Sequence, residues 1–310
     1  MWCRAGWETR ISCRSWRRRR RSRSCWRTPG NSWPQPGRML RPSPRRVFRW
    51  GGRVPVWLGN AIAGAGARVV VLRPPAAVLR WRANVAAVVG LEPDRRATRL
   101  LIRHWLMNRL WSLSLAKWPN LRRISIDPAD EQRMRDSLAG PGLVLALPHM
   151  GSWDGAGAWC TRAGMPVVSV AERLPDGLFE EFRSAREAMG MKIYPVAERG
   201  LTDSLAADVA DGLVLCLLAD RDLSAHGVAV RWPTGFVSKV PAGPALLARR
   251  TGADLRVATA RFVGGRLRLS VSERIVVDEV VPTMQRVVER FAAAISADPA
   301  NWLVLQPMTR

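Results

Sequence analysis

Short apolar runs alternate with helix-like segments from Leu143 onward, and this alternation constrains the fold more than any other feature of the chain. Four runs have the length and composition of strands: Leu143–Leu147, Val167–Ala171, Lys192–Val196 and Leu213–Ala219. Three segments with the length of helices lie between them: Asp154–Ala163, Gly177–Met189 and Thr202–Val209. Strands that are joined by helices pair in parallel through right-handed crossovers. We therefore predict an α/β fold with a central, mainly parallel sheet flanked by helices.

The segments on either side of this region complete the predicted fold. Before it, residues 75–120 have apolar side chains at mixed three- and four-residue spacing, which predicts helices. After it, Gly264-Gly265 separates two strand-like runs and predicts a hairpin turn. The later elements that we expect are a helix at Ala245–Arg250, hairpin strands at Leu255–Val263 and Leu267–Val271, and a final helix at about Thr283–Ala297.

The positive charge of the chain is concentrated at its N-terminal end. Of the formal net charge of +24, residues 1–53 supply +15, from 16 arginines and the single acid Glu8. The unbroken run Arg17–Arg21 has tryptophans on both sides, a composition that can bind nucleic acid or anionic lipid. No periodic apolar pattern supports a fold there, so we predict that residues 1–53 are a disordered or non-native extension. Residues 54–310 are then the functional domain.

Residues 54–72 are apolar but too interrupted to cross a membrane. Asn60 and Arg68 break the run, which is also diluted by glycine. With Trp57 and Trp81 among many arginines, this part of the chain is typical of an amphipathic region at a membrane interface. The alternative is that these tryptophans fill an ordinary helical core. The first interpretation predicts an N-terminal helical region that faces a membrane.

The five cysteines show no spacing of the kind that holds metal ions. Cys160 and Cys216 lie in apolar segments, where we expect them to be small core residues, and the other three lie within residues 1–53. We predict no metal centre.

His149 is the first candidate for a catalytic residue. It follows the predicted strand Leu143–Leu147, and Asp154 comes five residues later, at the expected start of a helix. Open α/β sheets bind their ligands at the carboxyl ends of strands, and an imidazole there can act as a general base for a substrate hydroxyl. Of the other histidines, His104 is expected to be packed in an apolar helix and His226 to be exposed in a polar loop.

Two acids, Asp220 and Asp222, follow the predicted strand Leu213–Ala219. They lie near His149 if the two strands are neighbours in a parallel sheet. One carboxylate could then orient the imidazole and stabilise its charged form. Without His149, the simpler interpretation of both acids is helix capping or a salt bridge in a loop.

Charged residues also follow the predicted strand Val167–Ala171. Glu172 comes directly after that strand, and Arg183 and Arg186 share one face of the helix that comes next. The two arginines could clamp a phosphate group of a substrate. Alternatively, they form salt bridges with Glu172, Glu180 and Glu187.

Several catalytic motifs are absent from the sequence. It has no Gly-x-Ser-x-Gly elbow, no phosphate-binding Walker loop and no Gly-x-Gly-x-x-Gly after a strand. What remains is one histidine with acids, which suffices to deprotonate a hydroxyl that attacks an already activated acyl donor. A thioester is such a donor and needs no nucleophile from the enzyme.

At these residues the chain resembles the lysophospholipid acyltransferase superfamily. Within it, the similarity is to the branch that holds the lipid A late acyltransferases and the actinobacterial phosphatidylinositol mannoside acyltransferases. The signature His-x-x-x-x-Asp is His149 to Asp154. The blocks of similarity are Leu145–Asp154, Val170–Leu174, Phe182–Gly190, Leu218–Leu223, the Lys239–Pro244 segment, and Trp302 with Gln306-Pro307.

The resemblance implies a peripheral enzyme on the cytoplasmic face of the membrane, with residues 54–310 as its acyltransferase domain. It implies transfer of a long acyl chain, typically palmitoyl, from acyl-CoA to a mannose 6-hydroxyl of phosphatidylinositol mannosides. Acyl-CoA is then a co-substrate, the membrane surface is anionic, and no cofactor is expected. By motif, His149 is the base, Asp220 orients it and Asp154 holds the histidine loop. Glu172 and Arg186 fall on positions that line the acceptor side.

Two other functions remain open on the sequence. A related acyltransferase could use another glycolipid or a lysophospholipid as its acceptor. A basic adaptor could bind nucleic acid or membranes through residues 1–53, although nucleic acid is not the partner that we expect.

Overall fold

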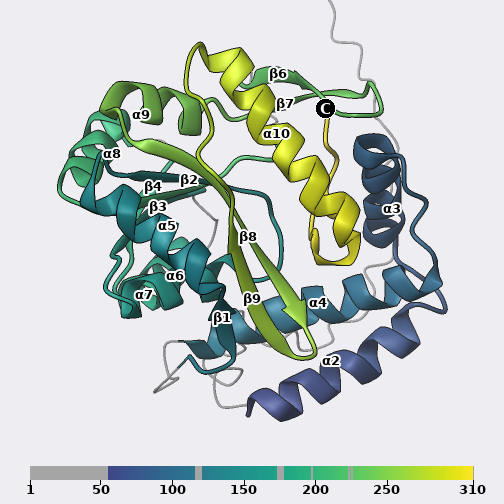
Figure 1. Ribbon diagram of the computed structural model, residues 1–310. Helices are drawn as coiled ribbons and strands as arrows, with labels where there is room; N and C mark the ends of the chain where they lie inside the picture. Colours follow the sequence, from purple (N-terminus) through teal and green to yellow (C-terminus); the bar gives the residue numbers. More distant parts are fainter. Residues whose placement is uncertain are drawn as a thin grey trace, which may run out of the picture. The chain divides into compact units, whose positions relative to one another are not determined.

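The computed structural model of the protein describes residues 55–115, 121–172, 178–196, 198–222, 224 and 226–309 (Figure 1). The predicted extension, residues 1–53, lies outside the described residues. Within them, a seven-stranded sheet has the strand order β1-β9-β8-β2-β5-β3-β4. Its strands are β1 (Ile124–Ile126), β2 (Leu143–Leu147), β3 (Val167–Ala171), β4 (Lys192–Pro195), β5 (Val214–Leu218), β8 (Asp254–Val263) and β9 (Arg266–Val271).

The sheet is mainly parallel, as predicted. Strands β8, β2, β5, β3 and β4 all run in one direction. Strand β9 turns back from β8 as a hairpin, and β1 runs parallel to β9 along the edge. The hairpin turns at Gly264 and Gly265, with φ of 58° and 81°, a left-handed conformation that glycine adopts without steric cost.

The predicted elements between residues 143 and 297 are confirmed with small shifts at their ends. The helices are α6 (Trp153–Arg162), α7 (Leu178–Glu187), α8 (Leu201–Ala210), α9 (Gly243–Thr251) and α10 (Val280–Ala297). The elements of the described residues that were not predicted are β1, the helix α5 (Pro128–Ala139), the antiparallel hairpin of β6 (Val228–Arg231) and β7 (Val237–Val240), and a short 3₁₀ helix at Pro299–Asn301. Strands β1, β6 and β7 have only three or four residues each, too few for a clear alternating pattern.

Helices cover both faces of the sheet, so that two apolar cores form. Alternate residues of β2 point to opposite faces: Val144 and Ala146 to one core, Leu143 and Leu145 to the other. The first core is closed by α3 (Ala76–Val89), α8, α9 and α10, and the second by α5 and α6. Figure 1 shows α10 and α3 side by side on the first face.

The N-terminal helices are separate rather than one continuous element. Helix α3 ends at Gly90, which has φ of 71°, and Asp94 caps the start of α4 (Arg95–Ser114). Helix α2 (Val56–Val70) lies along α4 at the bottom of Figure 1. Among the described residues, no helix combines the length and the apolar character that crossing a bilayer requires.

Candidate active site

His149 lies in a tight loop between β2 and α6. Gly151 in this loop has φ of 57°, and a Cβ atom there would lie 2.3 Å from the carbonyl oxygen of Ala260. Only glycine therefore fits at this position. Ser152 caps α6 by accepting a hydrogen bond from the backbone N–H of Gly155 at 3.2 Å. The loop thus has a fixed path from the end of the strand to the start of the helix.

Asp220 lies beside His149 because β5 is the neighbour of β2. The register pairs Leu147 with Leu218, so the two strands end at the same edge of the sheet. Nδ1 of His149 lies 2.5 Å from Oδ1 of Asp220, and the backbone N–H of His149 donates to Oδ2 at 2.8 Å. The prediction that parallel pairing of these strands would bring the two residues together is confirmed.

The Asp220 carboxylate is buried, with none of its side chain exposed. Burial by itself raises the pKa of a carboxyl group, but the charge of His149 and the hydrogen bonds from His149 and Trp302 outweigh it and hold the pKa of Asp220 below its usual value. The group is therefore ionised at neutral pH. An ionised carboxylate only accepts hydrogen bonds, so the proton of the neutral imidazole lies on Nδ1.

The second ring nitrogen of His149 is then free to accept a proton. The side chain is 28% exposed, and its Nδ1 faces the buried carboxylate, which leaves Nε2 as the ring nitrogen that Asp220 does not contact. Trp153 packs edge-on against the imidazole, with ring centroids 5.4 Å apart. This arrangement suits a general base, because the Asp220 carboxylate at Nδ1 stabilises the charged form of the imidazole.

Asp154, the second residue of the signature, has partners other than His149 and Asp220. Its Oδ1 accepts a hydrogen bond from Nε of Arg186 on α7 at 2.8 Å, and its Oδ2 accepts one from Oγ of Ser112 on α4 at 2.7 Å. Both charged side chains are largely buried. Asp154 thereby ties the start of α6, directly after the histidine loop, to two other helices.

The other predicted site residues lie further out. Arg183 pairs with Glu187 on the exposed side of α7, so the two arginines of that helix do not form a joint clamp. Glu172 is exposed at the end of β3. Asp222 accepts a hydrogen bond from the backbone N–H of Ser224 at 2.6 Å. Within the described ranges, no cluster of histidine, cysteine, aspartate and glutamate is arranged to hold a metal ion.

The other two histidines have the surroundings that were expected. His104 is buried, its Nδ1 lies 3.0 Å from the carbonyl oxygen of Ala300, and burial lowers its pKa. His226 is exposed.

Trp302, near the C-terminus, contacts the pair directly, and the sequence analysis assigned it no role. Its indole N–H donates to Oδ2 of Asp220 at 2.7 Å. Its presence in a block of similarity was the one signal for it, since a contact across 82 residues leaves no mark in the spacing. Ser112 was missed for the same reason.

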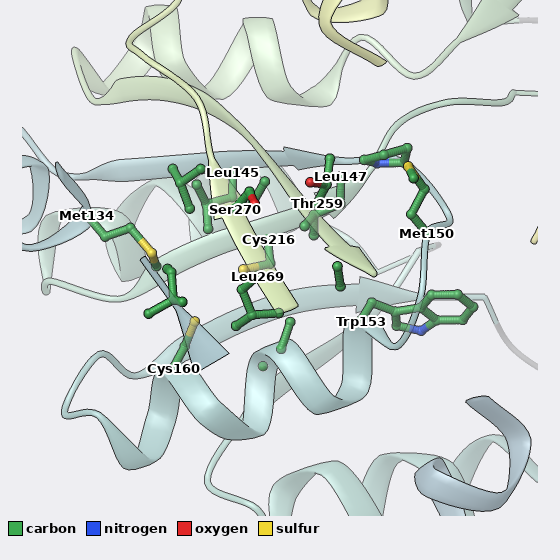
Figure 2. Close-up of a pocket in the computed structure, with 17 residues that line it drawn as sticks. Met134, Leu145, Leu147, Met150, Trp153, Cys160, Cys216, Thr259, Leu269 and Ser270 are labelled. Carbon is green, nitrogen blue, oxygen red and sulfur yellow. The ribbon is translucent and has the colours of Figure 1, made fainter. Parts of the chain in front are cut away.

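An apolar cavity lies between α6 and the sheet (Figure 2). Met150 and Trp153 lie at one end, next to the histidine loop, and Met134 and Cys160 lie at the other. Small side chains from α6 and β8 line its walls, among them Ala156, Ala258 and Ala260. Burial raises the pKa of the Cys160 thiol to about 12, so Cys160 is a neutral core residue, as predicted. The cavity is thus apolar, and Pro148 and Met150, the residues on either side of His149, belong to its lining.

Known proteins resemble this chain over most of its length. Residues 122–310 match a protein family described as bacterial lipid A biosynthesis acyltransferase. A protein of Mycolicibacterium smegmatis named phosphatidylinositol mannoside acyltransferase is 34% identical over 267 residues, which is 82% of this chain and 86% of that protein. A protein of Mycobacterium tuberculosis strain H37Rv with the same name is 38% identical over 174 residues, 54% of this chain and 55% of that protein.

Proposed function

Since the chain belongs to the bacterial lipid A biosynthesis acyltransferase family and is an O-acyltransferase, we propose that it moves a palmitoyl chain from acyl-CoA to a mannose 6-hydroxyl of a phosphatidylinositol mannoside. The observation that carries the proposal is that an apolar cavity ends at Met150 and Trp153, next to the histidine loop, and that His149 is paired with Asp220. The pair supplies a base for a hydroxyl, and the cavity supplies a place for an acyl chain.

In the proposed reaction, Nε2 of His149 takes the proton of the acceptor hydroxyl as its oxygen attacks the thioester carbonyl carbon. Asp220 stabilises the imidazolium that forms, through the hydrogen bond to Nδ1. When the tetrahedral intermediate collapses, the carbon–sulfur bond breaks and the imidazolium returns its proton to the coenzyme A thiolate. The products are an ester and free coenzyme A. The thioester is already activated, so the reaction requires neither a metal nor a further cofactor.

The cavity supports a long-chain donor. Its lining is almost entirely apolar, with Thr259 and Ser270 as the exceptions. Each methylene that leaves water for such a lining gains about 0.8 kcal/mol, which favours an acyl chain over a polar group there. With the chain in the cavity, the thioester carbon lies near Met150 and Trp153, next to His149.

The mannoside acceptor rests on the names of the two mycobacterial relatives. In this proposal the acceptor approaches Nε2 of His149, from the side where Glu172 follows β3. Arg186 contributes through Asp154, because its guanidinium is held in the ion pair. Arg183 and Asp222 lie at the periphery of this side.

We also infer that the protein works at an anionic membrane surface, as a peripheral protein on the cytoplasmic face. Helix α2 packs on α4 through small residues, with Ala63 and Ala67 fully buried. Its outer face exposes large apolar side chains, including Trp57 at 66% and Val69 at 69%, beside the exposed Arg68. Apolar side chains next to arginine are the composition of an interfacial helix.

Product analysis tests the proposed function. Purified protein is incubated with palmitoyl-CoA and one of three acceptors: a phosphatidylinositol mannoside, another glycolipid, or a lysophospholipid. Mass spectrometry of the lipids is expected to show one added palmitoyl group on the mannoside, on a mannose ring after fragmentation. Faster acylation of another acceptor would assign the enzyme a different substrate. Absence of acylation, together with binding to nucleic acid or anionic lipid that requires residues 1–53 and is unchanged in His149→Ala, would replace the proposal by the basic adaptor.

A further inference from the structure

The Asp220 carboxylate receives three hydrogen bonds from two residues that are far apart in the sequence. Oδ1 faces Nδ1 of His149, whereas Oδ2 accepts from the backbone N–H of His149 and from Nε1 of Trp302. The two donors on Oδ2 fix the rotation of the carboxylate about its own axis. That rotation directs Oδ1 at the imidazole, since both oxygens belong to one planar group.

Trp302 is part of a C-terminal segment that pairs with the histidine loop. Met150 and Trp302 form an antiparallel bridge, and the backbone N–H of Leu303 donates to the carbonyl oxygen of His149 at 2.7 Å. On the other side, the backbone N–H of Gly151 donates to the carbonyl oxygen of Asn301 at 2.9 Å. The loop that carries the base is therefore held by backbone bonds on both sides of Met150.

This segment has anchors of its own, separate from His149 and Asp220. The side chain of Asn301 is buried and accepts a hydrogen bond from the backbone N–H of Phe262 on β8 at 2.7 Å. The amide nitrogen of Asn301 donates to Asp298 at 2.8 Å. His104 on α4 contacts the carbonyl oxygen of Ala300. The indole of Trp302, none of which is exposed, thus reaches Asp220 from a rigid support.

We propose that Trp302 is a positioning residue, whose indole N–H orients the Asp220 carboxylate toward His149 and so keeps the base ready for proton transfer. The inference rests on the proposed function of His149 as the base. A fully buried carboxylate needs its hydrogen bonds satisfied, and in such a low-dielectric place each donor has a strong effect on its orientation. Without the indole N–H, Oδ2 keeps one donor and the carboxylate can rotate away from Nδ1.

The alternative is that Trp302 only fills the core, and one substitution with a matched control separates the two. Trp302→Phe keeps an aromatic ring and removes the N–H donor. Trp232 is also a buried tryptophan with a bound N–H, which donates to Oγ of Ser238 at 2.9 Å, on the β6–β7 hairpin. Trp232→Phe therefore removes the same atoms without touching Asp220.

We expect Trp302→Phe to lower kcat about tenfold or more, the size of a lost hydrogen bond to a charged group, with KM for palmitoyl-CoA and for the mannoside little changed. Trp232→Phe is expected to lower the melting temperature by a similar amount and to leave kcat close to that of the unchanged protein. The proposal is overturned if the two variants have equal kcat, or if Trp302→Phe raises KM and leaves kcat unchanged. If Trp302→Phe does not fold, nitrogen-15 chemical shifts of Trp302 and His149 in the unchanged protein and in Asp220→Asn test the same coupling. The resonances of the Trp302 indole and the His149 imidazole should both differ between the unchanged protein and Asp220→Asn. An indole resonance that is the same in both proteins overturns the proposal.

A double-mutant cycle shows whether the indole acts through the carboxylate. Trp302→Phe is combined with Asp220→Asn, and kcat is measured for both single variants and the pair. Action through Asp220 predicts that Trp302→Phe changes kcat less than about threefold once Asp220 is replaced. Losses that multiply instead mean that Trp302 only supports the structure. His149→Ala is measured in parallel. If this variant keeps its activity, the proposed mechanism is wrong. If it loses activity but the effects of Trp302→Phe and Asp220→Asn on kcat multiply independently, only the role of Trp302 is wrong.

Discussion

Nε of Arg186 lies 2.8 Å from Oδ1 of Asp154, so the aspartate of the His-x-x-x-x-Asp signature is held in an ion pair with α7. The partner of His149 is Asp220 instead, from a different strand. The two acids therefore have separate tasks. Asp220 acts on the imidazole, and Asp154 secures the helix that follows the histidine loop to α7 and α4.

His149→Ala should lower acyl transfer about 10²–10⁴-fold, the usual cost of removing a general base. The fold should survive, because the side chain lies in a loop and is 28% exposed. Turnover is measured with palmitoyl-CoA and the mannoside, and the melting temperature by thermal unfolding. His226→Ala, in an exposed loop, is the control and should retain full activity. Near-normal turnover of His149→Ala would refute the base mechanism.

Asp220→Asn should reduce kcat far more than Asp222→Asn. The first substitution keeps the shape but removes the negative charge that stabilises the imidazolium, and a fall of about 10²–10⁴-fold is expected. Among the described contacts, the side chain of Asp222 bonds only to the backbone of its own loop, so Asp222→Asn should reduce kcat only slightly. Steady-state rates of the two variants give the comparison, and the reverse ranking would assign the wrong acid to His149.

Arg186→Gln should lower the free energy of unfolding by about 3 kcal/mol, because it leaves the largely buried Asp154 carboxylate without its charged partner. Arg183→Gln, one turn earlier on the same helix, should leave that free energy nearly unchanged, since its pair with Glu187 is exposed. Urea unfolding of both variants measures the difference. Equal stability of the two would show that the Asp154–Arg186 pair does not secure α6. A KM for the mannoside that rises without loss of stability would place Arg186 on the acceptor instead.

Ala156→Leu should shift the preferred donor from palmitoyl-CoA to shorter chains, because the added methyl groups take space from the cavity. Rates with acyl-CoA donors of about eight to sixteen carbons are compared at one concentration, because each methylene that is buried gains about 0.8 kcal/mol. Ala207→Leu, on the exposed side of α8, is the control and should keep the original preference. An unchanged chain-length profile of Ala156→Leu would mean that the acyl chain binds elsewhere.

Ile62→Glu should weaken binding to anionic vesicles, since Ile62 is 52% exposed on the outer face of α2. Binding is measured by flotation with vesicles of anionic or neutral lipid at low and high salt. The protein lacks residues 1–53 in this experiment, so that their charge does not contribute to binding. Val276→Glu is the matched control, an apolar side chain that is 66% exposed before α10. If Ile62→Glu and Val276→Glu weaken vesicle binding equally, α2 is not the specific contact with the membrane surface. Binding of the shortened protein is expected to weaken at high salt.

The sequence indicated the main elements of the fold because they depend on local patterns. Strands β2, β3 and β5 are short apolar runs, and each is bounded by residues that end a strand. The same patterns placed His149 and Asp220 at strand ends, from which their proximity followed once parallel pairing was assumed. Strand β1 and the β6–β7 hairpin escaped prediction because three or four residues hold too little pattern.

By itself, the sequence determined which side chains can do chemistry here and at which edge of the sheet they lie, since apolar periodicity and strand ends are properties of neighbouring residues. The contacts that surround the His149–Asp220 pair follow only from the tertiary structure. The ion pair of Asp154 with Arg186, the bond from Ser112 and the contact of Trp302 with Asp220 join residues 32 to 82 positions apart. Such contacts depend on how helices and strands pack, and packing is set by the whole set of buried side chains rather than by any local spacing.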